Sequence, residues 1–396
     1  MSIKRVFIYL IAFIVPPLTL GLTLTFHTLS QLMVHQAPPP FETPEQKPAD
    51  AHKSVAPTGK LKAMIVLSNS GTEITELLGT YEILAESGKF DIVTAAYDRR
   101  IVPTTSSVGL IPDYSLNNSP EVDLLVIPSV LDGSEPRLVG WLTSHAKRAK
   151  LILVMSEGAR LGMNAGLFKH RAGTSHRLAI SNLTKSEPTA RWLSGIRYVI
   201  DGKLISTSSV TASLDATFYA VEKLAGLPAA RKTEKALGYR WMREADPTHA
   251  GLTPAPLPKG IGFDPQEIGQ MVMRAGYDWE KRNVGVLVYP GVSELGLAAA
   301  LDTFPRTFRM RLAAVGPDRE LILTRHGLGL IPHQGLKEAG DPDFVLIPSG
   351  MAPGGLPPST DPLKIPIVHQ WMVRSQALAK SFLSDLPGTA FEQNLT

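Results

Sequence analysis

The sequence predicts an α/β fold in which helices cover both faces of a doubly wound, mostly parallel sheet. Short and almost wholly apolar runs at 62–68 (KAMIVLS), 90–96 (FDIVTAA) and 123–129 (DLLVIPS) alternate with helical patterns. Strands of this composition are typical of parallel sheets that are buried on both faces. The same order of segments recurs later in the chain, so we expect one full copy and a truncated second copy of this unit.

The N-terminal segment predicts a membrane anchor within residues 1–30. Lys4 and Arg5 precede Val6 to Phe26, a stretch without a charged residue. At a rise of about 1.5 Å per residue, a helix of this length crosses the roughly 30 Å core of a bilayer. Positive charges before the span favour a cytoplasmic N-terminus, so we expect a single-pass protein whose globular part is extracytoplasmic, periplasmic or extracellular if bacterial. A cleaved signal peptide is the alternative interpretation.

Proline-rich residues 31–60 predict an extended linker, and the first full copy is expected at 61–227. A helical pattern at 73–87 (EITELLGTYEILAES) separates the first two strands, and another at 141–150 follows the third. The stretch 201–226 (DGKLISTSSVTASLDATFYAVEKLAG) has the pattern of a hairpin, a serine-rich turn and a final helix. These segments together predict a flavodoxin-like unit.

Internal repetition predicts the second copy at residues 283–396. Residues 283–304 (NVGVLVYPGVSELGLAAALDTF) repeat the pattern of residues 62–83, and DPDFVLIPSG at 341–350 repeats EVDLLVIPSV at 121–130. We expect this copy to continue through a helical segment, WMVRSQALAK, that resembles WLTSHAKRAK of the first copy, and to stop short of a working site. Leu386 is expected near the position of Ser156, and residues 228–282 are expected to form an arm between the copies that packs through Met271, Met273 and Trp279.

Composition excludes several classes of function. The formal net charge is +4 without a dense run of basic residues, so we expect no nucleic-acid partner. The absence of cysteine excludes disulfides and thiolate metal sites. Nucleotide-binding and zinc-binding spacings are also missing, so neither a cofactor nor a metal ion is expected. His326 and His333 flank a glycine-rich hairpin and are expected to be exposed.

The candidate site centres on Ser156, which stands where the apolar strand of LILVMSEG (151–158) ends and a tight turn into a helix begins. Such an elbow lifts one side chain above the edge of the sheet. Glu76 follows a glycine turn at the start of the first helix, and His176 lies downstream in AGTSHR. This pattern over residues 62–227 resembles the ThiJ/PfpI superfamily (class I glutamine amidotransferase-like), whose strand ends here in a cysteine nucleophile. The resemblance implies that Glu76, Ser156 and His176 share a site.

The chain departs from the superfamily pattern at two places. Ser156 replaces the cysteine, and a serine hydroxyl needs a general base, for which His176 is the candidate with Glu76 as its orienter. Ser129 stands in the segment Pro128-Ser129-Val130, where the superfamily has Pro-Gly-Gly and a backbone N–H that helps to form an oxyanion hole. Losing one such donor costs about 2.7–4 kcal/mol of transition-state stabilisation.

Two functions are compatible with these residues. The first is a membrane-anchored, non-catalytic sensory or regulatory domain that binds a small polar ligand or a partner, similar to the ThiJ/PfpI domain of AraC-type regulators but without their helix-turn-helix part. The second copy then takes the place of a dimer partner in an internal pseudo-dimer. The alternative is a serine-dependent hydrolase or hydratase that acts on an amide, ester or isocyanide-like carbon. In the simplest alternative, Ser156 only satisfies backbone groups, His176 lies at the surface and Glu76 is stabilised by the helix dipole.

Overall fold

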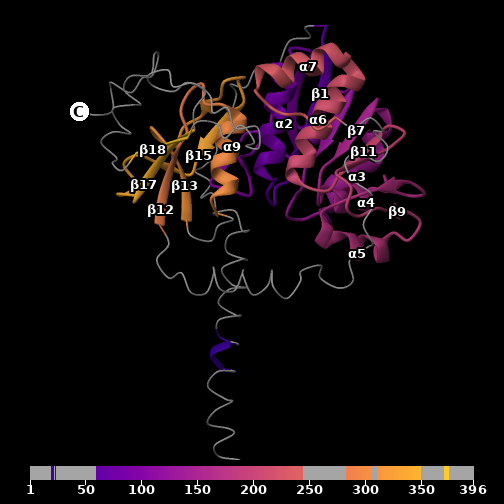
Figure 1. Cartoon of the computed structure of the whole chain (residues 1–396), viewed down its shortest axis with the longest axis horizontal. Helices are drawn as coiled ribbons and strands as arrows, with labels where there is room; N and C mark the ends of the chain where they lie inside the picture. Colours follow the sequence, from indigo (N-terminus) through magenta and orange to yellow (C-terminus); the bar gives the residue numbers. More distant parts are fainter. Residues whose placement is uncertain are drawn as a thin grey trace, which may run out of the picture.

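The structure is a computed structural model that describes residues 19–21, 23, 59–243, 282–305, 310–348 and 370–373. Two α/β units lie side by side, one drawn from indigo to pink and the other from orange to yellow (Figure 1). The α/β class with a mostly parallel sheet is therefore confirmed. Several residues on which predictions were made lie outside the described ranges: most of the linker, the arm after residue 243, Met271, Met273, Trp279 and Leu386.

The predicted single-pass membrane location is contradicted by the structure. Crossing a bilayer takes about 20 consecutive apolar residues in one helix. Among the residues that the structure describes, no helix combines that length with that apolarity. Of the predicted span Val6 to Phe26, only Thr19, Leu20, Gly21 and Thr23 fall within the described ranges.

The first unit contains a seven-stranded sheet in the order β10-β11-β7-β6-β1-β2-β5. Neighbouring strands are parallel except for β10 and β11, which form an antiparallel hairpin at one edge. The strands are β1 (Leu61–Val66), β2 (Phe90–Ala96), β5 (Tyr114–Ser115), β6 (Leu124–Ile127), β7 (Leu151–Val154), β10 (Tyr198–Asp201) and β11 (Leu204–Thr207). Short strands outside this sheet are β3 (Val102–Pro103), β4 (Val108–Leu110), β8 (Ala172–Gly173) and β9 (Arg191–Trp192).

Helices cover both faces of this sheet because successive residues of each strand point to opposite sides. Ile65 of β1 belongs to one buried apolar cluster, whereas its neighbours Met64 and Val66 belong to the other. The first cluster includes residues of α2 (Ile74–Glu86), α6 (Val210–Ala225) and α7 (Leu227–Ala236). The second cluster includes residues of α3 (Pro136–His145), α4 (Gly158–Asn164) and α5 (Arg177–Ser186).

The second unit repeats the order of the first. Its sheet has the order β16-β13-β12-β17-β18, in which the first four strands correspond to β5-β2-β1-β6. The strands are β12 (Arg282–Leu287), β13 (Met310–Gly316), β14 (Ile322–Leu323), β15 (Gly329–Pro332), β16 (Gln334–Gly335), β17 (Phe344–Pro348) and β18 (Gln370–Val373), and the helix after β12 is α9 (Glu294–Thr303).

One part of the second copy differs from the prediction. Residues 371–373, expected within a helix that matches WLTSHAKRAK, lie in strand β18, which pairs with β17 in the antiparallel direction. A strand at this position satisfies backbone groups of β17 that otherwise form an open sheet edge. The helical similarity of the sequence is therefore overridden by pairing with a neighbouring strand.

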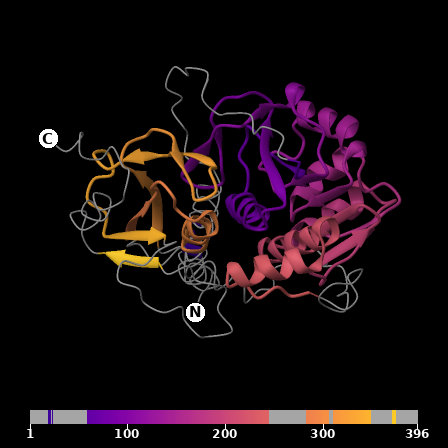
Figure 2. The same cartoon turned by 90° about the horizontal axis from the view of Figure 1, so that it is seen from above.

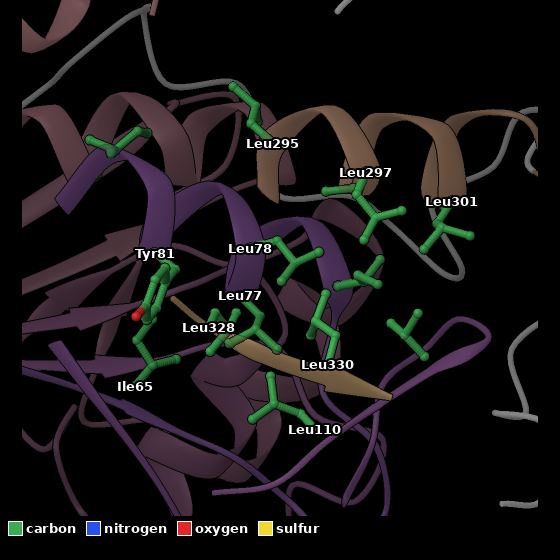
Figure 3. Close-up of a cluster of buried hydrophobic side chains, with 14 of the residues drawn as sticks. Ile65, Leu77, Leu78, Tyr81, Leu110, Leu295, Leu297, Leu301, Leu328 and Leu330 are labelled. Carbon is green, nitrogen blue, oxygen red and sulfur yellow. The ribbon is translucent and has the colours of Figure 1, made fainter. Parts of the chain in front are cut away.

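The two units share one apolar core. Helices α2 and α9 lie side by side in both views (Figures 1 and 2), and β15 pairs with β4 to join the units in a four-stranded sheet β14-β15-β4-β3. Figure 3 shows Leu77 and Leu78 of the first unit close to Leu297, Leu328 and Leu330 of the second. The first unit therefore buries one side of its helical layer against the second.

Candidate functional site

The elbow after β7 places Ser156 in an unusual backbone conformation. Ser156 has φ 43°, and apart from His170 it is the only non-glycine residue in the described ranges with a positive φ. Its N–H donates to Thr207 Oγ1 at 3.0 Å, and its carbonyl oxygen accepts from Ser175 Oγ at 2.8 Å. These hydrogen bonds hold a conformation that costs an L-residue free energy. Ser156 is 6% exposed and is therefore buried.

Gly158, the first residue of α4, allows this elbow to lie against the end of β6. A Cβ atom on Gly158 would lie 2.6 Å from both Ile127 O and Pro128 O. Both contacts are with backbone atoms, which cannot rotate away as a side chain can. The position of Ser156 therefore depends on glycine two residues later.

We expect Gly158→Ala to destabilise the protein by about 1–3 kcal/mol, because an added methyl group overpacks the elbow. The free energy of unfolding in urea measures this change. Gly140→Ala is the matched control, since the space around Gly140 in α3 is open. There, alanine is expected to be neutral or to stabilise by up to about 1 kcal/mol. Equal effects of the two substitutions would contradict the close approach of the elbow to β6.

Glu76 is fully buried in the first turn of α2, and its carboxyl group contacts two parts of the site. Oε2 accepts from Ser129 N at 2.7 Å, and Ser213 Oγ lies 3.4 Å from Oε1. Burial raises the pKa of Glu76 from 4.5 to about 7, although the hydrogen bonds from Ser129 and Ser213 act in the opposite direction. The carboxyl group is therefore about half protonated near neutral pH.

A chain of hydroxyl groups connects Glu76 with the elbow. Ser213 Oγ lies 2.7 Å from Thr207 Oγ1, which accepts from the Ser156 N–H. Ser213 and Thr207 were not singled out from the sequence. The sequence feature that could have identified them is the serine-rich turn within residues 201–226, because its hydroxyl groups can form hydrogen bonds with neighbouring polar groups.

The Ser129 turn is bound to α2 through both of its backbone groups. Ser129 N donates to Glu76 Oε2, and Ser129 O accepts from Glu73 N at 2.8 Å. Ser129 Oγ also accepts from Glu157 N at 3.0 Å and so supports the elbow. The serine side chain therefore has a structural role at the position where the superfamily pattern has glycine.

His176 lies beside a residue that the sequence analysis did not select. It is the N-cap residue of α5, and its Nδ1 lies 3.7 Å from Oε1 of Glu157, the residue next to Ser156. The side chains of His176 and Glu157 are 38% and 45% exposed. The structure thus brings an imidazole and a carboxylate together at the surface of the elbow, while Glu76 lies beneath it.

The second unit lacks the buried carboxyl group of this site. Gly296 N donates to the N-cap residue Ser293 of α9 at 3.1 Å, as Glu76 N donates to the N-cap residue Glu73 of α2 at 2.6 Å. Gly296 therefore occupies the position that corresponds to Glu76. Within the described residues of the second unit, α9 therefore presents no carboxyl group at the position of Glu76.

The expectation that His326 is exposed is wrong. Its side chain is only 17% exposed, and its Nδ1 lies 2.9 Å from Glu294 Oε2. The spacing of the hairpin residues could not reveal this, because the carboxylates around His326 come from distant segments. Glu82, Glu294 and His326 also place potential metal-ligand atoms within 4.8 Å of one another, which the spacing did not suggest.

Comparison with known proteins identifies the first unit. Residues 62–223 match the sequence model of the DJ-1/PfpI family, which confirms the resemblance to the ThiJ/PfpI superfamily. No curated protein matches the sequence. Similar solved structures include a ThiJ/PfpI family protein from Pseudomonas syringae (22% identity, TM-score 0.42, 48% of this chain and 82% of that chain covered). A DJ-1 superfamily protein from Salmonella typhimurium is 24% identical with a TM-score of 0.41, and the match covers 46% of this chain and 100% of that chain. An AraC family transcriptional regulator from Pseudomonas putida is 20% identical with a TM-score of 0.40, and the match covers 45% of this chain and 99% of that chain.

Proposed function

We propose that the DJ-1/PfpI family domain at residues 62–223 binds a small polar ligand and does not catalyse a reaction of that ligand. The observation that carries this proposal is the hydrogen bond of 2.7 Å from Ser129 N to Glu76 Oε2. This N–H belongs to the segment Pro128-Ser129-Val130, where the superfamily has Pro-Gly-Gly and a backbone N–H that helps to form an oxyanion hole. In this protein the donor is already bound to a buried carboxyl group.

A reacting oxyanion gains little at this position. To reach Ser129 N it has to displace Glu76, and the displaced carboxyl group loses its strongest donor in a buried environment. When Glu76 is ionised, its charge also repels the developing negative charge of the transition state. An oxyanion hole needs donors that are aimed at the reacting oxygen before the reaction begins, and this donor is not.

Ligand binding is supported by the half-exposed pair at the elbow. Glu157 and His176 offer a carboxylate and an imidazole that solvent reaches, and Glu157 directly follows Ser156 in the elbow. These groups together provide hydrogen-bond donors and acceptors for a small polar molecule. If ligand binding at the elbow also affects the second unit through the shared apolar core, the domain acts as a sensory or regulatory domain.

The second unit takes the place of a dimer partner in this proposal. Helices α2 and α9 pack together, and β4 pairs with β15 across the contact. In both contacts an element of one unit pairs with an element of the same kind in the other unit, as happens in a symmetric dimer. We therefore infer an internal pseudo-dimer, in which the second unit supports the first without a site of its own.

The alternative function, a serine-dependent hydrolase or hydratase, is favoured by one observation. Ser156 has φ 43° at a strand-to-helix turn, a strained conformation that nucleophiles of hydrolases also adopt. In that function Ser156 attacks the carbon of an amide, ester or isocyanide-like group. His176 takes the proton of the hydroxyl, and the carboxylate beside its imidazole is that of Glu157 and not that of Glu76, which the sequence suggested as the orienter.

Labelling with a fluorophosphonate separates the two functions. We expect the full chain to be labelled no more than Ser156→Ala, because no strong base activates the hydroxyl and the oxyanion donor is occupied. Ser181→Ala is the matched control for a serine outside the site. Labelling that disappears in Ser156→Ala and persists in Ser181→Ala would favour the hydrolase.

The binding arm of the same test uses thermal denaturation with a panel of free amino acids and small amides. A compound that binds only the native state raises its apparent stability. We expect the stabilisation by any such compound to be reduced in both His176→Ala and Glu157→Gln. Stabilisation that is unchanged in both variants would contradict a site at the elbow.

A further inference from the structure

A second cluster of ionisable side chains lies where the two units meet. Glu82 comes from α2 of the first unit, Glu294 is the first residue of α9, and His326 lies in the turn between β14 and β15. Each contributes a potential ligand atom, and these atoms lie within 4.8 Å of one another. The Glu82 and Glu294 side chains are 2% and 0% exposed, so both carboxylates are almost completely removed from water.

This burial leaves negative charge that the protein balances only in part. Arg325 lies 3.7 Å from Glu82 Oε1, but its side chain is 38% exposed and its charge is screened by water. His326 adds a positive charge only when it is protonated. Buried carboxylates of this kind are normally paired with a cation or bound to a metal ion.

Hydrogen bonds fix each of the three side chains so that they converge. Glu294 Oε1 accepts from Thr324 Oγ1 at 2.6 Å and from His326 N at 2.9 Å, and its other oxygen therefore points to the imidazole. Glu82 Oε2 accepts from Ser293 Oγ at 2.8 Å and from Leu295 N at 2.5 Å. Glu82 Oε1 is bound less closely, with Ser293 Oγ at 3.1 Å. These contacts orient the carboxylates without using all of their oxygen lone pairs.

The environment of His326 resembles that of a metal ligand. Its Nδ1 lies 2.9 Å from Glu294 Oε2, and its opposite ring nitrogen, Nε2, lies 3.3 Å from Glu86 Oε2. A histidine that binds a metal through one nitrogen usually donates its other N–H to a carboxylate, which fixes the ring and increases its basicity. Glu86 is placed to accept this hydrogen bond.

We propose that Glu82, Glu294 and His326 bind a zinc ion that links the two units. Ligand atoms at about 2.0–2.2 Å from a tetrahedral ion lie about 3.4 Å apart, so the observed cluster has to change little to accept one. The ion is held by Glu82 Oε1, Glu294 Oε2 and His326 Nδ1, and water takes the fourth position. Binding needs a neutral imidazole, so any proton on Nδ1 is released to solvent while Nε2–H stays bound to Glu86.

Imidazole and carboxylate together favour zinc over the hard cations. Magnesium and calcium prefer sites made of oxygen atoms, whereas zinc accepts nitrogen and oxygen ligands and needs only four. The site is built from both units, with one ligand from the first and two from the second. It lies apart from the elbow and does not depend on the function proposed there.

Zinc binding by the full chain, stripped with a chelator and then dialysed, tests this site. Isothermal titration with zinc chloride is expected to give one ion per chain, and zinc is expected to raise the melting temperature. Removing a ligand in Glu82→Gln or His326→Gln is expected to weaken binding by at least about 100-fold, and Glu86→Gln by about 10–100-fold. His333→Gln, at the other end of the same hairpin, is the control and is expected to bind as the unmodified chain does.

Three results would overturn the proposal. The first is the absence of zinc binding to the full chain, which would leave His326 as a protonated bridge between carboxylates. The second is an affinity that His326→Gln and His333→Gln reduce equally, which would indicate that zinc is not held specifically by the cluster. The third is an affinity for zinc that stays unchanged in both single variants, Glu86→Gln and His326→Gln. Circular dichroism without zinc establishes folding, and if Glu82→Gln does not fold, the His326 and Glu86 variants decide the outcome.

Discussion

Raising the pH from about 5 to about 8 is expected to lower the free energy of unfolding by roughly 2–3 kcal/mol through Glu76 alone. The pKa of Glu76 is about 7 in the folded protein, against 4.5 for the ordinary carboxyl group. Between these two values the folded protein keeps a proton that the unfolded chain has lost. The stabilisation is therefore complete below pH 4.5 and is lost as the pH rises through 7. Urea unfolding at a series of pH values measures it.

Glu76→Gln is expected to remove most of this pH dependence. The glutamine amide resembles the protonated carboxyl group, because its oxygen accepts from Ser129 N and its NH₂ group donates to Ser213 Oγ. The variant should therefore be about as stable as the unmodified protein near pH 5 and more stable near pH 8. Glu121→Gln, at an exposed position, is the control and should leave the dependence intact. The same slope in all three proteins would show that Glu76 titrates normally.

Leu297→Ala is expected to destabilise the whole protein by about 2–5 kcal/mol, the usual range for a large-to-small change in a core. Leu297 of α9 is fully buried in the cluster that both units share (Figure 3). If the second unit folds only against the first, fluorescence and circular dichroism should report one urea transition that moves as a whole. Leu323→Ala is the control in the same unit, because Leu323 is 49% exposed.

The internal pseudo-dimer would be contradicted by two separate transitions of which only one is shifted by Leu297→Ala. That result would mean that the units fold independently. Sedimentation of the full chain provides a second measurement, since a contact surface that is already covered within the chain predicts a monomer. An obligate dimer of the full chain would also count against the proposal.

The sequence predicted the central strands because parallel sheets impose a strong local pattern. Strands β1, β2, β6 and β7 are short apolar runs, and both faces of each are buried whatever the rest of the chain does. The repeat was visible for the same reason. Strand β18 could not be predicted, because its conformation depends on the open edge of β17 and not on its own helical pattern.

The site was predicted less completely than the fold. Ser156, Glu76 and His176 were selected from the elbow and the superfamily pattern, and Ser129 was singled out because the superfamily has glycine there. The hydrogen bond from Ser129 N to Glu76 was not, because it joins residues 53 positions apart. Contacts between the units could not be predicted from local sequence patterns, because residues such as His326 and Glu86 are separated by 240 positions in the sequence.

Joining both units in one chain frees them from symmetry. A homodimer must present every interface residue twice, whereas here the counterparts can differ. Glu294 and Ile74 are both the first residues of their helices, yet one is a carboxylate and the other is apolar. The pairing of β4 with β15 also cannot be lost by dilution, because the covalent connection keeps each unit at a high effective concentration near the other. Each half of this molecule can therefore carry different residues at corresponding positions while its neighbour stays in place.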